Sequence, residues 1–302
     1  IMQISGGVQL SGGVNLIPGG SGPTPGGAYS FQGSNFGYTS GGDNHPTSGD
    51  RTSDIIQKFS FASDQNGTDV GDLASAVASN SGQSSSTSGY SSGGGVVNSG
   101  SGYTDIQKFA FSTDGNATDV GDLLSIVAHS CGQSSGASGY VSGSNRPTVS
   151  NVIQKFPVAS DGNATDVGNL TLARAGTSGQ SSSDSGYTAG GAAPNGNYYD
   201  RIDKFPFASD SDATDVGDLT AQTTQMGSGQ SSTTHGYATG GVVGPFHQSK
   251  IDKFSFTSDG NASNIGNLTV TQAAGSGQSS TDSGYASGGN INDRYTLTNT
   301  IE

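Results

Sequence analysis

A repeat of 47 to 52 residues organises this 302-residue sequence, and self-similarity at such a period is typical of arrays of equivalent structural units. Three motifs (Lys-Phe, Thr-Asp-Val-Gly and Gly-Gln-Ser-Ser) follow one another in five units, with the second altered to Ser-Asn-Ile-Gly in the last unit. The period suits one four-stranded propeller blade and is roughly twice that of a leucine-rich repeat. A Gly-Tyr-x-x-Gly-Gly element (the Gly-Tyr element) opens each of these units and occurs a sixth time after them, with Ser144 replacing the second glycine of one copy. Its tyrosines are Tyr38, Tyr90, Tyr140, Tyr187, Tyr237 and Tyr285.

Strand patterns are readable inside each unit. In residues 55–61, Phe59 and Phe61 fall on one face while Ile56 and Lys58 fall on the other, as in a β-strand. Apolar atoms on both faces are expected for a sheet packed between two neighbouring sheets. Residues 64–67 (Asp-Gln-Asn-Gly) predict a hairpin turn before a return strand. Six Gly-Tyr elements, four strands per unit and no predicted helix favour an all-β, six-bladed propeller over a β-sandwich.

The propeller is expected to span residues 31–302, as five complete repeats plus a split or incomplete blade. Residues 1–30 form a Gly/Pro-rich arm with two tandem Ser-Gly-Gly-Val-x-Leu elements. This arm is expected either to supply a strand that closes the ring or to tether the chain to a partner subunit. Residues 300–302 align with the residues that precede Lys-Phe in the other units. The last blade is therefore expected to lack its outer part, unless an N-terminal strand completes it or the chain is a fragment.

These motifs resemble the kelch repeat, although no Trp occupies the outer strand as it does in typical kelch blades. They are most similar to the kelch-like repeats of marine phage virion and tail fibre proteins. The shared strings are Ile-Asp-Lys-Phe at residues 251–254, Ser-Asp-Gly-Asn-Ala-Thr-Asp-Val-Gly at 160–168, Gly-Gln-Ser-Ser at 229–232 and His-Gly-Tyr at 235–237.

The resemblance implies a non-enzymatic structural protein of an extracellular virion, acting in assembly or host-surface attachment. Its implied partners are other virion or fibre subunits, including further copies of itself, and a host-surface glycan or protein. A carbohydrate- or protein-binding extracellular propeller is the alternative, and an enzyme is a third class.

Composition and charge exclude several other classes. The net charge is -13 and the eleven Lys and Arg residues are scattered, whereas nucleic-acid binding needs basic clusters. No run of about 18 apolar residues occurs, so we expect no membrane insertion. The four histidines have no metal-ligand spacing, neither a Gly-x-Ser-x-Gly elbow nor an arginine triad occurs, and Cys131 is a single cysteine. We therefore predict no catalytic residue and no cofactor.

One recurring turn has a calcium-like spacing of oxygen-bearing side chains. The sixth position of the turn is Asp rather than the Gly that a calcium loop requires, which favours a hairpin turn whose Asp and Thr side chains bond nearby amides. We therefore predict no metal, with calcium as the alternative. The ligands in that alternative would be Asp64, Asn66, Asp72, Asp114, Asn116, Asp122, Asp210, Asp212 and Asp218.

Two further sets of residues carry predictions. The lysine of each Lys-Phe pair is expected to form an ion pair with the aspartate of the adjacent Asp-Val-Gly strand, such as Asp69 or Asp119. The connections after each double glycine differ between units and are expected to emerge together on one side of the ring, where recognition tends to reside. The candidate binding residues in these connections are Tyr103, Arg146, Tyr198, Tyr199, Arg201, Arg294 and Tyr295.

Overall fold

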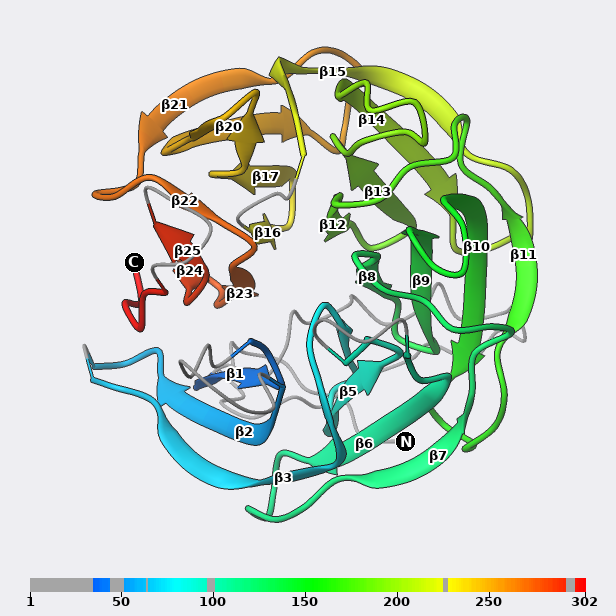
Figure 1. Cartoon of the computed structure of the whole chain (residues 1–302), viewed down its shortest axis with the longest axis vertical. Coiled ribbons are helices and arrows are strands. Elements are labelled where there is room, and N and C mark those ends of the chain that lie inside the picture. Colours follow the sequence, from blue (N-terminus) through cyan, green and yellow to red (C-terminus); the bar gives the residue numbers. More distant parts are fainter. Residues whose placement is uncertain (1–34, 44–51, 64, 97–100, 225–227, 292–296) are drawn as a thin grey trace, which may run out of the picture.

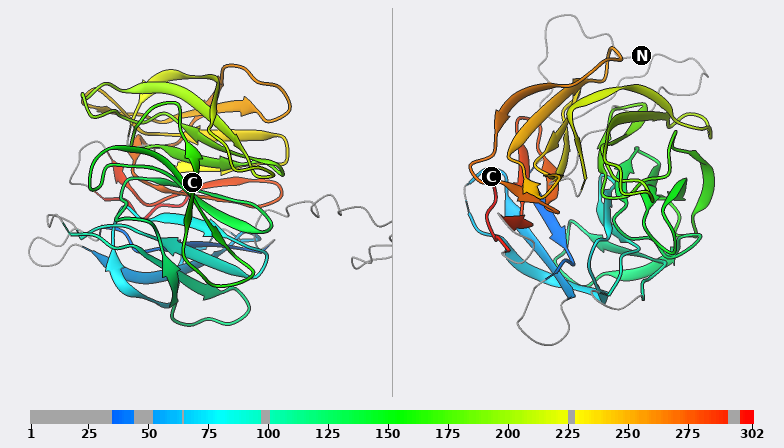
Figure 2. Two further views of the ribbon diagram at one scale, coloured as in Figure 1. Left: turned by 90° about the vertical axis from the view of Figure 1, so that its right-hand side faces the viewer. Right: turned by 45° about the horizontal axis from the view of Figure 1, so that its top comes forward.

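The computed structural model describes residues 35–43, 52–63, 65–96, 101–224, 228–291 and 297–302. The predicted N-terminal arm lies outside these ranges. All regular secondary structure in the described ranges is β-strand. The sheets are arranged in a ring around a central axis (Figure 1), and Figure 2 views the same ring from two further directions. The chain is thus an all-β propeller, as the repeat predicted.

Five sheets of three or four antiparallel strands form the blades. Blade 1 consists of β1 (Phe36–Ser40), β2 (Ser53–Ser60) and β3 (Thr68–Val77). Blade 2 consists of β4 (Ser81–Ser84), β5 (Ser88–Ser92), β6 (Asp105–Ala110) and β7 (Thr118–Asp122). Blade 3 consists of β8 (Cys131–Ser134), β9 (Ser138–Ser144), β10 (Ser150–Pro157) and β11 (Thr165–Asn169).

Blades 4 and 5 repeat the same order from the axis outward. Blade 4 consists of β12 (Ser178–Ser181), β13 (Ser185–Ala189), β14 (Tyr199–Pro206) and β15 (Thr214–Thr223). Blade 5 consists of β16 (Ser228–Ser231), β17 (His235–Thr239), β20 (Lys250–Ser255) and β21 (Ser263–Asn267). The short hairpin of β18 (Val242–Val243) and β19 (Phe246–His247) lies in the connection from β17 to β20.

The sixth place, between blade 5 and blade 1, holds only two-stranded sheets. They pair β23 (Ser276–Ser279) with β24 (Gly284–Ser287), and β22 (Gln272–Ala273) with β25 (Asn290–Ile291). The expectation of six four-stranded blades is therefore wrong, and five blades form. The reason is that a blade needs the Lys-Phe strand as well as the Gly-Tyr strand, and the sequence has six Gly-Tyr elements but five Lys-Phe pairs.

The end of the sequence follows the predicted alignment. Ile301 bridges to Ser287, in the register that pairs Ile106 with Ser92 in blade 2. Residues 301 and 302 thus lie beside β24 where a third strand of the sixth place would begin. The ring also closes here, since the Gln278 side-chain amide donates to the carbonyl of Tyr38 in blade 1 at 3.2 Å.

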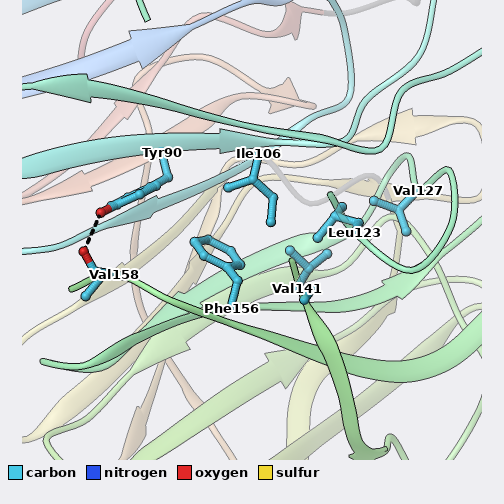
Figure 3. Close-up of a cluster of buried hydrophobic side chains, with 8 residues drawn as sticks. Tyr90, Ile106, Leu123, Val127, Val141, Phe156 and Val158 are labelled. Carbon is cyan, nitrogen blue, oxygen red and sulfur yellow. Dashed lines mark hydrogen bonds between the residues drawn. The ribbon is translucent and has the colours of Figure 1, made fainter. Parts of the chain in front are cut away.

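Apolar cores lie between neighbouring blades, because both faces of each sheet carry apolar side chains. Between blades 2 and 3, Tyr90 and Ile106 pack against Phe156 and Val141, as Figure 3 shows. The Tyr90 hydroxyl donates to the carbonyl of Val158 in the next blade at 3.1 Å. Each such side chain stabilises the fold by about 1.5–3 kcal/mol through its burial. The cores therefore bind the blades to one another.

Glycine in the Gly-Tyr element makes room for an aromatic ring. Gly89 pairs with Phe109 across β5 and β6, and a Cβ on Gly89 would overlap the Phe109 ring. The same relation recurs at the glycine of every blade. The double glycine that follows has a different cause, because Gly93 and Gly94 have φ of 63° and 100°, which other residues rarely adopt.

In four of the five Lys-Phe pairs, the lysine bonds a different aspartate from the one predicted. Lys58 in blade 1 contacts Asp114 in the turn of blade 2 at 3.0 Å, and not Asp69 on the adjacent strand. Three further lysines contact the next blade's turn in the same way, at 2.8 to 3.1 Å: Lys108 with Asp161, Lys155 with Asp210 and Lys204 with Asp259. The prediction failed because it considered only partners within one blade, whereas the ammonium group reaches across the blade interface.

Candidate functional site

The ring has two faces with different chemistry. The loop face carries the connections after the double glycines, together with residues 78–80 and their equivalents. The turn face carries the Asp-containing turns and the short turns between the two inner strands. Since all strands within a blade are antiparallel, the connections alternate between these faces. The variable connections therefore share one face, as the repeat alignment predicted.

A cavity of about 640 Å³ runs along the axis and includes residues of the loop face. Its wall is formed by inner-strand backbone, by small polar side chains such as Asn80, Ser130 and Ser178, and by aromatic side chains such as Tyr90 and Phe109. Arg146 lines it from the connection after β9. Such a concave space, with both polar groups and aromatic rings on a rigid scaffold, is suited to binding a small ligand.

Three residues around the cavity adopt a backbone conformation that is unusual for residues other than glycine. Ser79, His129 and Ala274 have φ of 58°, 53° and 55°. Each precedes an inner strand, and the backbone of one blade bonds that of the next, as in His129 N to Ser79 O at 3.1 Å. Such conformations cost about 1–3 kcal/mol each and tend to cluster at functional sites.

His129 and Arg146 form the most chemically distinctive part of the cavity wall. The His129 Nε2 atom lies 3.3 Å from the Ser79 hydroxyl. Burial lowers the pKa of His129, with a further lowering by the positive charge of Arg146, against a hydrogen bond with Asn145 that raises it. His129 is therefore neutral near pH 7. No ion pair of Arg146 occurs within the described ranges, so its guanidinium is available for an anionic or hydroxyl-rich ligand.

Among the described residues, the inner strand β4 of blade 2 has no inner-strand neighbour on the side of blade 1. In four inner strands, the glycine faces the preceding inner strand so closely that no Cβ would fit: Gly132, Gly179, Gly229 and Gly277. The space beside the equivalent Gly82 is open. The hydroxyl of Ser134 accepts the amide of Ser84 at 3.0 Å, yet the buried hydroxyl of Ser84 has no hydrogen-bond partner. The repeat pattern did not reveal this gap, since it depends on which inner strands are present.

The predicted binding residues have different positions. Arg146 lines the axial cavity, whereas Tyr103 packs against the core between blades 1 and 2. Arg201 is held by Asp215 at 3.2 Å and by the hydroxyl of Thr171 at 3.0 Å. Tyr198 and Tyr199 are half-buried in the connection after β13 and at the start of β14, and Arg294 and Tyr295 lie outside the described residues. The structure thus brings only Arg146 of this set to the cavity.

Four of the proposed calcium ligands bond residues of the preceding blade instead. Asp114 and Asp210 bond lysines, and Asn116 and Asp212 accept the backbone amides of Asp72 and Asn169 at 3.1 and 2.8 Å. Asp122 accepts a hydrogen bond from Thr104 at 2.7 Å. Among the described residues, no three His, Cys, Asp or Glu side chains gather as a metal site. Asp64 lies outside those residues, Asn66 is exposed, and Asp218, like Asp72, donates its backbone amide to an asparagine of the next turn.

A buried ion pair between the connection that leaves blade 3 and a strand of blade 4 was not predicted. Arg174 Nη2 lies 3.2 Å from Asp203 Oδ2, and both side chains are fully buried. Burial lowers the pKa of Arg174, against the charge of Asp203. An alignment of the repeats contains a signal for this pair, because Arg174 occupies the position of Val77 and Val127 in other units. Cys131 is buried, as expected for a single small residue.

Comparison with known proteins supports the fold. The solved structure described as "Structure of YjhT" is similar with a TM-score of 0.68 and 12% sequence identity, over 82% of this chain and 87% of that one. At this identity the similarity concerns the propeller fold alone. No family model and no curated protein sequence matches the chain, so the kelch-like and phage resemblance stays a prediction. The described part of the chain contains no helix with the length and apolar character that crossing a membrane requires.

Proposed function

We propose that this chain is a non-enzymatic structural protein of a virion or fibre, in which a rigid propeller takes part in assembly or host-surface attachment. The observation that carries the proposal is the use of the recurrent polar residues in contacts between blades. The repeated Gln, Ser, Lys and Asp side chains bond the next blade, as Gln133 Nε2 does to the Tyr187 carbonyl at 2.9 Å. A scaffold built from such near-identical interfaces is stable without a cofactor.

Fractionation of a culture that produces the protein tests this role. Purified particles and the soluble fraction are compared by quantitative mass spectrometry, with a known particle protein and a soluble enzyme as references. We expect the chain to be enriched with the particle protein and to remain after a wash in high salt. Recovery only with the soluble enzyme would contradict the structural role.

The alternative, a carbohydrate-binding propeller, is favoured by one specific observation: Arg146 lines a cavity that also presents hydroxyl and amide groups and the aromatic rings of Tyr38 and Tyr90. A glycan array with the purified chain tests it, and the ligand that scores highest is then titrated. Arg146→Ala is expected to weaken that binding at least about tenfold, which corresponds to the loss of about 1.4 kcal/mol. The control is Lys108→Ala on the turn face, which should leave the affinity unchanged. Binding that is insensitive to Arg146 would assign the glycan to another surface.

A further inference from the structure

The face of blade 5 that borders the sixth place lacks contacts that the other blades make. In blade 4, Tyr187 stacks on Phe256 of the next blade with ring centroids 4.7 Å apart. Tyr38, Tyr140 and Tyr285 stack in the same way, at 4.9, 4.8 and 4.7 Å. Tyr237 is the equivalent residue of blade 5, and no aromatic ring contacts it among the described residues. A ring-binding position is therefore unfilled.

The charged contact of this interface is also missing. Lys253 pairs across the sheet with Tyr237, in the register that pairs Lys108 with Tyr90. Lys108 bonds Asp161 of the next blade, whereas Lys253 forms no ion pair with a described residue. A carboxylate from a neighbouring turn would complete the pattern that four other lysines follow.

The outer strand of blade 5 also lacks, among the described residues, the turn that packs on the equivalent strand of blade 4. A Cβ on Gly217 would meet the carbonyl of Gly260 in the turn of the next blade, while the space beside Gly266 is open. Ile265 is 53% exposed, although the equivalent Val167 of blade 3 is 9% exposed. The strand is thus shaped for a turn that packs on it.

The contacts in the sixth place show where an element bound to this face of blade 5 would lie. Glu302 Oε2 accepts the Thr269 amide at 2.6 Å, just as Asp252 Oδ2 accepts the Thr220 amide at 2.9 Å. Beyond this point Gly284 is exposed, whereas its equivalent Gly236 lies under the ring of Phe254. The next element along β24 would therefore place an aromatic ring over Gly284 and against Tyr237.

We propose that the blade 5 face, formed by Tyr237, Lys253, Ile265, Gly266 and Gly284, binds a β-hairpin with the chemistry of the repeat's own outer strands. The hairpin carries an aromatic-x-aromatic strand and an Asp-containing turn. Its rings pack on Tyr237 and over Gly284, its carboxylate bonds the Lys253 ammonium, and its turn backbone packs on Gly266. The occupant follows from complementarity with four equivalent interfaces, and it does not depend on the role proposed above. Strand addition at a sheet edge supplies the backbone hydrogen bonds.

A synthetic peptide with the sequence of residues 253–268 is the probe, titrated into the full chain by isothermal calorimetry. It begins after the positions equivalent to residues 301 and 302, which already lie beside β24. We expect saturable binding with one peptide per chain. Replacing both phenylalanines of the peptide by serine should weaken binding at least about tenfold, since both rings lose their burial. No binding, or equal binding of a peptide with the same composition in scrambled order, would overturn the proposal.

A charge exchange locates the bound peptide. Lys253→Glu should weaken the peptide severalfold, and a peptide with lysine at the position of Asp259 should recover part of that loss. Lys108→Glu is the matched control, because its ammonium already bonds Asp161. Equal effects of the two substitutions would contradict binding at the blade 5 face.

Labelling at the surface keeps the test independent of affinity. An Ile265→Cys variant is treated with a maleimide, and the parent chain, whose Cys131 is buried, gives the background. We expect rapid labelling that the peptide slows severalfold. A labelling rate that the peptide does not change would overturn the proposal. Slow labelling without the peptide would also overturn it, because another part of the chain would then cover the blade 5 face.

Discussion

Gly132 faces the carbonyl oxygen of Gly82 across neighbouring inner strands, so closely that a Cβ on Gly132 would overlap it. The same relation links Gly179 to Gly132 and continues around the axis to Gly277. The inner strands can converge on the axis only because their central residue has no side chain. This explains the glycine of the Gly-Gln-Ser-Ser element in the four units whose inner strand follows another inner strand.

Gly132→Ala should therefore destabilise the fold by at least about 2 kcal/mol, in the range of overpacked cores, because the obstacle is backbone that cannot turn away. Gly82→Ala is the matched control, since the space beside Gly82 is open. We expect the control to stay within about 0.5 kcal/mol of the parent chain. Urea unfolding measures both values, and equal losses would contradict the packing at the axis.

Two serines of the inner strands should respond differently to the loss of their hydroxyl. Ser134 Oγ accepts the Ser84 amide at 3.0 Å, so Ser134→Ala should cost about 1 kcal/mol or more by leaving that amide unpaired. The buried Ser84 hydroxyl has no partner, so Ser84→Ala should be neutral or stabilising. The two unfolding free energies are compared in the same buffer. A larger cost at Ser84 would indicate that the gap beside blade 2 is filled in solution.

The buried pair of Arg174 and Asp203 should be strongly coupled. Asp203→Gln leaves the Arg174 charge unpaired in the core and should cost about 3–5 kcal/mol. The double variant, which adds Arg174→Val, has the valine and glutamine that occupy the equivalent positions between blades 2 and 3. Its free energy of unfolding should lie within about 1 kcal/mol of that of the parent chain. A double-mutant cycle by urea unfolding measures the coupling. Additive losses would show that the pair does not act as a unit.

Stability should fall as the pH rises above about 10. Burial raises the pKa of Tyr140, and the hydrogen bond to Asp210 raises the pKa of Lys155, although burial opposes the latter. The folded chain therefore keeps protons that the unfolded chain loses, and linkage makes unfolding more favourable as the pH rises. Urea unfolding at pH 8 and pH 11 checks this, with Tyr140→Phe expected to show a smaller decrease. Equal stability at both values would contradict it.

Much of the fold was predictable because it is written in short-range patterns. The alternation in residues 55–61 predicted β2. The repeat identified a propeller and placed the variable connections on one face. The predicted number of blades was wrong because only the Gly-Tyr elements were counted, whereas a blade requires both the Gly-Tyr strand and the Lys-Phe strand.

The candidate site was less predictable. The sequence pointed to Arg146 in a variable connection, but not to the left-handed residues Ser79 and His129, since neither is a glycine. It also missed the Arg174–Asp203 pair, because each residue was judged alone and not against its equivalents in other units.

By itself the sequence determined the strand pattern, the all-β class and the order of motifs within each unit, because side chains two residues apart share a strand face wherever the strand lies. Only the tertiary structure decided which units touch through which atoms. Lys58 and Asp114 are 56 residues apart, and Gln278 reaches Tyr38 across 240 residues. Such pairs depend on the angle between neighbouring blades. The packing of aromatic rings and axial glycines sets this angle, and no local sequence pattern specifies it.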